Sequence, residues 1–69
     1  MDNKQVKETL VKMGWNLLPE TKCWEDEGYF FFEVQPESQY GYTVQVDPET
    51  GKSRHCGNGR GCFWTEWEA

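Results

Sequence analysis

The chain has 69 residues, enough for one domain that buries only roughly 60% of its unfolded surface, so the fold has little stability to spare. Hydrophobic residues make up 36% of the chain and aromatic residues 16%, and this ratio predicts a core built largely from rings. Twelve acidic against seven basic residues give a net charge of −5, which disfavours nucleic acid as a partner and favours a basic protein.

The N-terminal residues predict a helix from about Asp2 to Met13. Asp2 and Gln5 have the spacing of a capping box, in which each side chain accepts a hydrogen bond from the other residue's backbone N–H. Apolar residues then recur at helical spacing on one face, namely Val6, Leu10 and Met13. Gly14 can adopt the left-handed conformation that ends a helix, and Trp15 stands where a Schellman motif places an apolar contact. The helix is therefore expected to stop at Gly14.

Beyond Lys22 the apolar residues alternate with polar ones, which predicts β-strands. The expected strands span residues 22–24, 29–35, 40–46, 53–56 and 62–67. An acidic turn at 25–28, a turn at Asp47–Lys52 that contains proline and glycine, and a glycine-rich loop at 57–61 separate some of them. The predicted fold class is α+β, with one N-terminal helix packed on a four- or five-stranded antiparallel meander sheet.

The two faces of this sheet are expected to differ in what covers them. The helix should pack on the face that carries Phe30, Phe32, Tyr42 and Val44. Trp64 and Trp67 lie three residues apart on a predicted strand and should face opposite sides. Together with Trp15, Trp24 and Phe31 they exceed what one helix can cover, so some rings should be exposed. Exposed Trp and Tyr are typical anchors of protein interfaces.

No apolar run approaches the roughly 20 residues that span a membrane, and the first residues lack the apolar stretch of a signal peptide. We therefore expect a cytoplasmic protein that does not associate with membranes. The sequence shows no internal repeat, linker or low-complexity tract, so residues 1–69 should form a single small domain.

The three cysteines are an odd number, and the sequence leaves their state open. Cys56 and Cys62 flank a five-residue loop, so pairing of the flanking strands would bring them close to disulfide geometry. Zinc is another alternative, with Cys23 and His55 as further ligands, although His55 and Cys56 should face opposite sides of a regular strand. In a reducing compartment, free buried thiols without metal or cofactor are the preferred interpretation.

Many carboxylates lie between residues 20 and 37, interrupted by rings. One interpretation is a solvated face that aids solubility. The functional interpretation is a surface that presents acidic and aromatic residues to a basic partner protein. Its candidate residues are Trp24, Glu25, Asp26, Glu27, Tyr29, Phe31 and Trp64. The sequence positions no nucleophile or second base beside these carboxylates, so no enzyme activity is expected.

The glycine-rich loop offers an alternative site for a nucleotide or nucleic acid. Its backbone N–H groups suit a phosphate, and tryptophans nearby suit stacking on bases. The candidate residues for this alternative are Arg54, His55, Asn58 and Arg60. The loop lacks the Gly-Lys-Ser/Thr ending of a Walker motif, and the basic groups are few on an acidic chain. Nucleic-acid binding therefore ranks second.

The sequence as a whole predicts a non-enzymatic protein-binding module, such as a small acidic inhibitor or adaptor. Homodimerisation is one way for it to bury its surplus rings, because a twofold interface needs only one self-complementary patch. The identity of a partner protein is not encoded in any motif of the chain.

Overall fold

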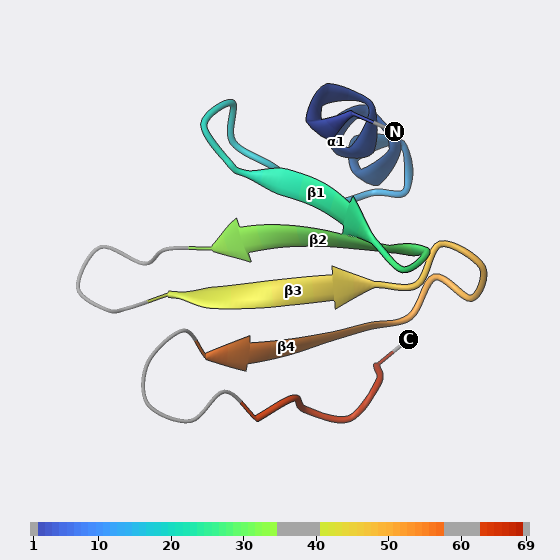
Figure 1. The fold of residues 1–69 in the computed structure, drawn as a ribbon, viewed down its shortest axis with the longest axis vertical. Helices are drawn as coiled ribbons and strands as arrows, with labels where there is room; N and C mark the ends of the chain where they lie inside the picture. Colours follow the sequence, from blue (N-terminus) through green and yellow to red (C-terminus); the bar gives the residue numbers. More distant parts are fainter. Residues whose placement is uncertain (1, 35–40, 58–62, 69) are drawn as a thin grey trace.

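The computed structural model describes residues 2–34, 41–57 and 63–68 (Figure 1). A helix precedes four strands, which are α1 (Asn3–Lys12), β1 (Cys23–Asp26), β2 (Tyr29–Val34), β3 (Tyr42–Val46) and β4 (Ser53–Gly57). The strands form one antiparallel sheet in the order β1-β2-β3-β4. The predicted α+β class and meander topology are confirmed. Figure 1 shows α1 beside β1 at one end of the molecule and the C-terminal segment beside β4 at the other.

Local hydrogen bonds define both ends of α1. Oδ1 of Asp2 accepts from the backbone N–H of Gln5 at 2.8 Å, and Oε1 of Gln5 accepts from the N–H of Asp2 at 3.1 Å. At the other end Gly14 has a φ of 104°. The N–H groups of Gly14 and Trp15 donate to carbonyl oxygens of the last helical turn at 3.0 and 3.1 Å. These are the capping box and the Schellman motif that the sequence predicts.

Gly14→Ala should destabilise the protein by about 1–2 kcal/mol, because a left-handed φ strains an L-residue with a side chain. Crowding is not the cause, since no atom lies within 4 Å of a Cβ added at this position. Gly57 is the matched control: its φ lies outside the left-handed region, and its added Cβ also meets nothing within 4 Å. Thermal denaturation of both variants is the measurement, and equal losses at the two positions would contradict this explanation.

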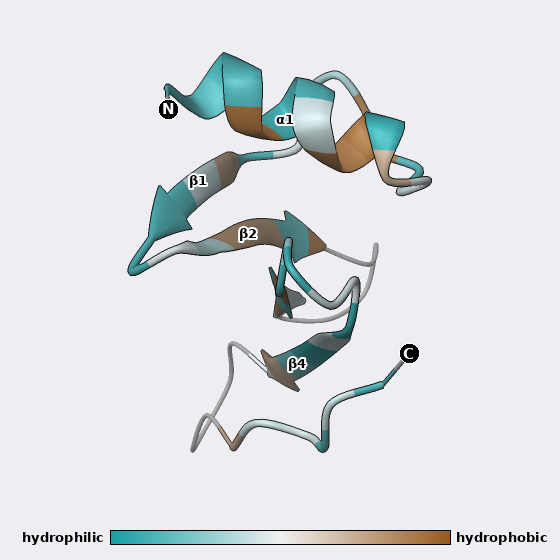
Figure 2. Ribbon diagram, turned by 90° about the vertical axis from the view of Figure 1, so that its right-hand side faces the viewer, coloured by the Kyte–Doolittle hydropathy of each residue, from teal (hydrophilic) through white to brown (hydrophobic). Residues whose placement is uncertain are grey.

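The core lies between α1 and the sheet face that carries the buried residues of β2 and β3. Its members are Val6, Leu10, Cys23, Phe30, Phe32, Val44 and Val46. Trp15 follows the helix and meets Phe32 edge-on, with ring centroids 5.1 Å apart. Figure 2 shows the apolar stripe of α1 turned toward β1. The predicted packing of Met13 in this core is wrong, because Met13 is the C-cap residue beyond the last turn and is 36% exposed.

The turn between β1 and β2 is tighter than predicted. Glu25 and Asp26, expected in the turn, belong to β1. The connection consists of Glu27 and Gly28, which both have positive φ, 52° and 84°. Positive φ at both positions is typical of the two-residue hairpin turn whose twist matches the flanking strands. The shorter turn extends β1 and adds two residue pairs to its ladder, Glu25 with Phe30 and Asp26 with Tyr29.

The Asp47–Lys52 turn lies where the sequence predicts it, between β3 and β4. The backbone N–H of Asp47 donates to the carbonyl oxygen of Lys52 at 2.9 Å, and the N–H of Gly51 donates to the carbonyl oxygen of Asp47 at 2.9 Å. Gly51 has a φ of 75°, a left-handed conformation that favours glycine. The hairpin prediction is therefore confirmed.

Residues 63–68 do not form the regular strand that the sequence predicts over 62–67. They meet β4 at a single antiparallel bridge, in which Ser53 and Glu68 exchange backbone hydrogen bonds of 2.8 and 2.7 Å. The N–H of Thr65 also donates to the carbonyl oxygen of His55 at 2.9 Å. The segment therefore follows the edge of the sheet without continuing its ladder. In the described part of the chain, no helix is both long and apolar enough to span a membrane.

Candidate functional site

The sheet face opposite the core carries a row of side chains that crosses all four strands. The registers align Trp24 of β1 with Phe31 of β2, Phe31 with Gln45 of β3, and Gln45 with Arg54 of β4. Directly paired residues share one face of an antiparallel sheet, and this row alternates with the core residues. We call this row, together with Tyr29, Trp64 and Trp67, the aromatic face.

The rings of the aromatic face contact one another. Trp24 and Phe31 stack nearly parallel, with centroids 5.6 Å apart and an interplanar angle of 5°. Phe31 also meets Trp64 at 6.5 Å, and Tyr29 stacks on Trp67 at 5.8 Å. Aromatic pairs at these separations stabilise each other by about 0.5–1.5 kcal/mol beyond the burial of their area. The rings are therefore held in defined positions.

The guanidinium of Arg54 joins the two groups of rings. Its Cζ lies 4.8 Å from the ring centroid of Trp64 and 4.6 Å from that of Trp67. Its Nε donates to Oε1 of Gln45 at 2.6 Å, and Gln45 is buried. The prediction that Trp64 and Trp67 face opposite sides is therefore wrong. Strict alternation applies only to a regular strand, and the irregular segment 63–68 brings both indoles onto one arginine.

Arg54→Ala should loosen both indoles and lower the free energy of unfolding by about 1–2 kcal/mol, from two cation–π contacts and a charged hydrogen bond. Tryptophan fluorescence should shift to longer wavelength as Trp64 and Trp67 become more hydrated. Lys52→Ala, which removes one positive charge from an exposed turn residue, is the control for charge. If Arg54→Ala leaves fluorescence and stability as in Lys52→Ala, the arginine does not organise the face.

The aromatic face is partly open to solvent. Trp24, Tyr29 and Phe31 are half-buried, and Trp64 and Trp67 are 38% and 36% exposed. Removing the remaining apolar area from water would contribute roughly 25 cal/mol per Å² to association. A complex in which a partner covers these rings would therefore be stabilised by burial of their exposed apolar surface.

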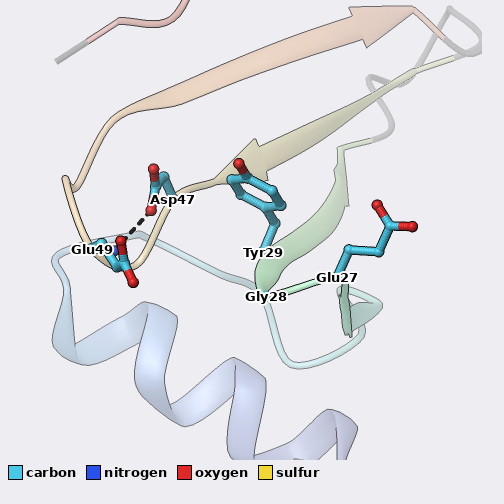
Figure 3. Close-up of a pocket in the computed structure, with 5 residues that line it drawn as sticks. All are labelled: Glu27, Gly28, Tyr29, Asp47 and Glu49. Carbon is cyan, nitrogen blue, oxygen red and sulfur yellow. Dashed lines mark hydrogen bonds between the residues drawn. The ribbon is translucent and has the colours of Figure 1, made fainter.

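Carboxylates lie around the aromatic face. Asp26 and Glu33 are exposed and lie on the same face as Trp24 and Phe31, two residues further along their strands. An open pocket at the end of the sheet is lined by Glu27, Gly28, Tyr29, Asp47 and Glu49. Figure 3 shows the Tyr29 ring between Asp47 and Glu49 on one side and Glu27 on the other. Tyr29 therefore belongs to both the pocket and the aromatic face, which makes the surroundings of the rings acidic.

Most of the predicted partner-binding residues come together in the structure. Glu25 is the exception, because it pairs with Phe30 and so faces the core side of the sheet. Glu27 lies in the turn at the end of the face. Gln45 and Trp67 were not among the predicted site residues. The alternation of β3 was a signal for Gln45, because it places this residue opposite the core. No sequence pattern places Trp67 on this face, because the segment 63–68 is not a regular strand. Of the predicted residues, Trp24, Tyr29, Phe31 and Trp64 belong to the aromatic face, and Asp26 lies at its margin.

The alternative nucleotide-binding residues that the structure describes do not form one cluster. Arg54 and His55 are neighbours on β4 and point to opposite faces. The His55 ring lies 5.3 Å from the ring of Tyr42, away from the aromatic face. Asn58 and Arg60 lie outside the described residues, so the glycine-rich loop stays a hypothesis from the sequence.

Two of the three cysteines are described, and their states differ. Cys23 is free and buried, whereas Cys56 is buried and disulfide-bonded. Cys62 lies outside the described residues. The prediction of a free thiol is therefore wrong for Cys56, because it gave the expected compartment more weight than the closeness of two cysteines that flank a short loop.

The candidate zinc ligands that the structure describes are also apart. Cys23 and His55 share one face but lie on β1 and β4, three strand spacings of about 4.8 Å from each other. Cys56 points to the opposite face. Among the described residues, no three His, Cys, Asp or Glu side chains gather in a way that suits a metal ion.

Alkylation of the unfolded, unreduced chain should label Cys23 alone. In the native protein the same reaction should be slow, because Cys23 is 2% exposed and burial raises the pKa of its thiol, although the charge of Lys7 partly lowers it. The neutral thiol therefore contributes stability that is lost as pH rises through the raised pKa. Mass spectrometry after labelling with and without reductant is the measurement. Labelling of all three cysteines without reductant would contradict the bond at Cys56.

Fold and site together define a small α+β domain with one sheet face in its core and an ordered aromatic face opposite. Comparison of the chain with protein-family models, with curated proteins and with solved structures finds no match. The function must therefore be inferred from the residues of the aromatic face themselves.

Proposed function

We propose that the chain is a non-enzymatic protein-binding module, a small acidic inhibitor or adaptor, and that its aromatic face binds a partner protein with a basic surface. The observation that carries the proposal is that the rings and Arg54 are ordered by mutual contacts yet partly exposed. Trp, Tyr and Arg dominate the binding energy of many interfaces. Side chains that are already ordered lose less conformational entropy on binding.

Charge supports a basic partner. The chain carries a net charge of −5, and Asp26, Glu33 and the pocket carboxylates lie at the margins of the aromatic face. Complementary charge accelerates association and excludes partners of like charge. Nucleic acid ranks lower for the same reason, and also because Arg54, the arginine described on this face, is already held by two indoles.

Self-association is a second form of the same proposal, since a twofold axis could pair two aromatic faces. Two copies would each carry −5, so added salt should strengthen a homodimer by screening repulsion. The same salt should weaken a complex with a basic protein. Sedimentation equilibrium at low and high salt therefore separates the two forms.

Quantitative affinity capture tests the proposal, with the wild-type chain and two variants as baits. Trp24→Ala should weaken capture of the partner by about 10-fold or more, as expected for an interface anchor. Val11→Ala is the control, because Val11 is 51% exposed on α1, away from the aromatic face. Circular dichroism confirms that both baits fold. A protein captured equally by wild type and Trp24→Ala, or lost with Val11→Ala, would contradict the proposal.

A further inference from the structure

We infer that the basic group recognised by the aromatic face is an arginine side chain of the partner, stacked on the exposed side of the Trp24 and Phe31 pair. This inference rests on the proposed function and specifies its partner chemistry. The occupant is a protein segment that bears arginine.

Arg54 shows how this face holds a guanidinium. The planar cation lies against indoles at 4.8 and 4.6 Å, and one of its N–H groups donates to a side-chain oxygen. Aromatic faces attract cations through the ring quadrupole, and arginine also stacks by virtue of its flat shape. The chain thus already contains one arginine site made of rings and an acceptor.

Trp24 and Phe31 offer similar rings on β1 and β2, on the same face of the sheet as Arg54 but nearer its other edge. The two rings stack with an interplanar angle of 5° and are half-buried, so part of their surface is accessible. Asp26 follows Trp24 by two residues on β1, and Glu33 follows Phe31 by two residues on β2. Each carboxylate therefore lies roughly 7 Å along its strand from the ring, on the same face.

These two carboxylates lie at opposite ends of the ring pair, because β1 and β2 are antiparallel. Both are exposed, and neither forms a side-chain hydrogen bond or ion pair with another described residue. A guanidinium on the rings can direct its N–H donors toward either end. Lysine has a point charge and no plane, so it would satisfy the carboxylates without stacking.

The acidic pocket extends the same complementarity. Its carboxylates, Glu27, Asp47 and Glu49, lie around Tyr29, the ring at the turn end of the aromatic face. A partner segment that places one arginine on Trp24 and Phe31 would carry its further basic residues toward this end. The arrangement therefore suits a segment with several cationic residues better than an isolated arginine.

Titration with two synthetic peptides tests the inference, one alternating glycine with arginine and one alternating glycine with lysine, at equal length and charge. The arginine peptide should bind about 10-fold more tightly, as stacking and forked hydrogen bonds predict. Trp24→Ala should abolish this preference, and Asp26→Asn should weaken binding of the arginine peptide. Leu18→Ala, at a residue 63% exposed outside the aromatic face, should leave the preference intact.

Equal affinity for the two peptides, binding of neither, or a preference that survives Trp24→Ala would each overturn the inference. So would tighter binding of a single-stranded oligonucleotide than of the arginine peptide. Affinity capture with the Trp24→Ala bait distinguishes failure of this inference from failure of the proposed function. If capture depends on Trp24 while the peptides show no preference, the protein-binding function stands and the arginine inference fails; if capture is also independent of Trp24, both fail.

Discussion

Replacing Leu10 with alanine should lower the free energy of unfolding by about 3 kcal/mol. Leu10 is fully buried in the core between α1 and the sheet. Truncation removes apolar contacts and leaves a cavity that a small core has few neighbours to fill. Because a domain of this size has low total stability, this loss should lower the urea midpoint of Leu10→Ala by a large fraction.

Val11→Ala is the matched control for this loss. Val11 is the next residue of the same helix but is 51% exposed, so its truncation should change stability by less than about 0.5 kcal/mol. Urea denaturation followed by circular dichroism measures both variants. A similar midpoint for Leu10→Ala and Val11→Ala would show that α1 does not pack on the sheet as described.

Phe31→Ala should weaken binding of the partner by about 30-fold, which corresponds to roughly 2 kcal/mol. Phe31 contacts both Trp24 and Trp64, so its removal separates the rings of β1 from those of the C-terminal segment. The effect should exceed that of Trp24→Ala, since two ring contacts are lost instead of one. Isothermal titration with the captured partner, or with the arginine peptide, measures it.

Phe63→Ala controls for the loss of a phenyl ring. Phe63 is 83% exposed, and the structure shows no ring contact for it with the described residues. Its removal should therefore leave affinity within about twofold of the wild type. If Phe63→Ala weakens binding as much as Phe31→Ala does, simple surface hydrophobicity accounts for binding and the ordered ring series does not.

Local signals explain which parts of the fold are predictable from the sequence. The capping residues of α1 and the glycine that follows it act within a few residues, and both helix ends lie where the sequence places them. The Asp47–Lys52 turn is predictable for the same reason. The conformation of the C-terminal segment is not predictable in this way. Its aromatic residues have the spacing of a strand, but its rings contact Arg54, which is distant in sequence.

The candidate site is predictable to the extent that strand alternation decides it. Alternation alone places Tyr29 and Phe31 on the face opposite the core, and pairing of β1 with β2 adds Trp24. It does not reveal that Arg54 is enclosed by two indoles, or that Gln45 is buried as its acceptor. Those features depend on where a segment without regular structure folds back on the sheet.

If a partner covers the aromatic face, the rings of this face should lose solvent exposure in the complex. Hydroxyl-radical footprinting with mass spectrometry tests this most directly, because oxidation of each side chain reports its exposure in the free and the bound protein. On addition of the captured partner, Trp24, Tyr29, Phe31, Trp64 and Trp67 should become protected. The exposed residues Val11, Met13 and Leu18 should be oxidised as before. Protection of these three with unchanged oxidation of the rings would contradict the claim.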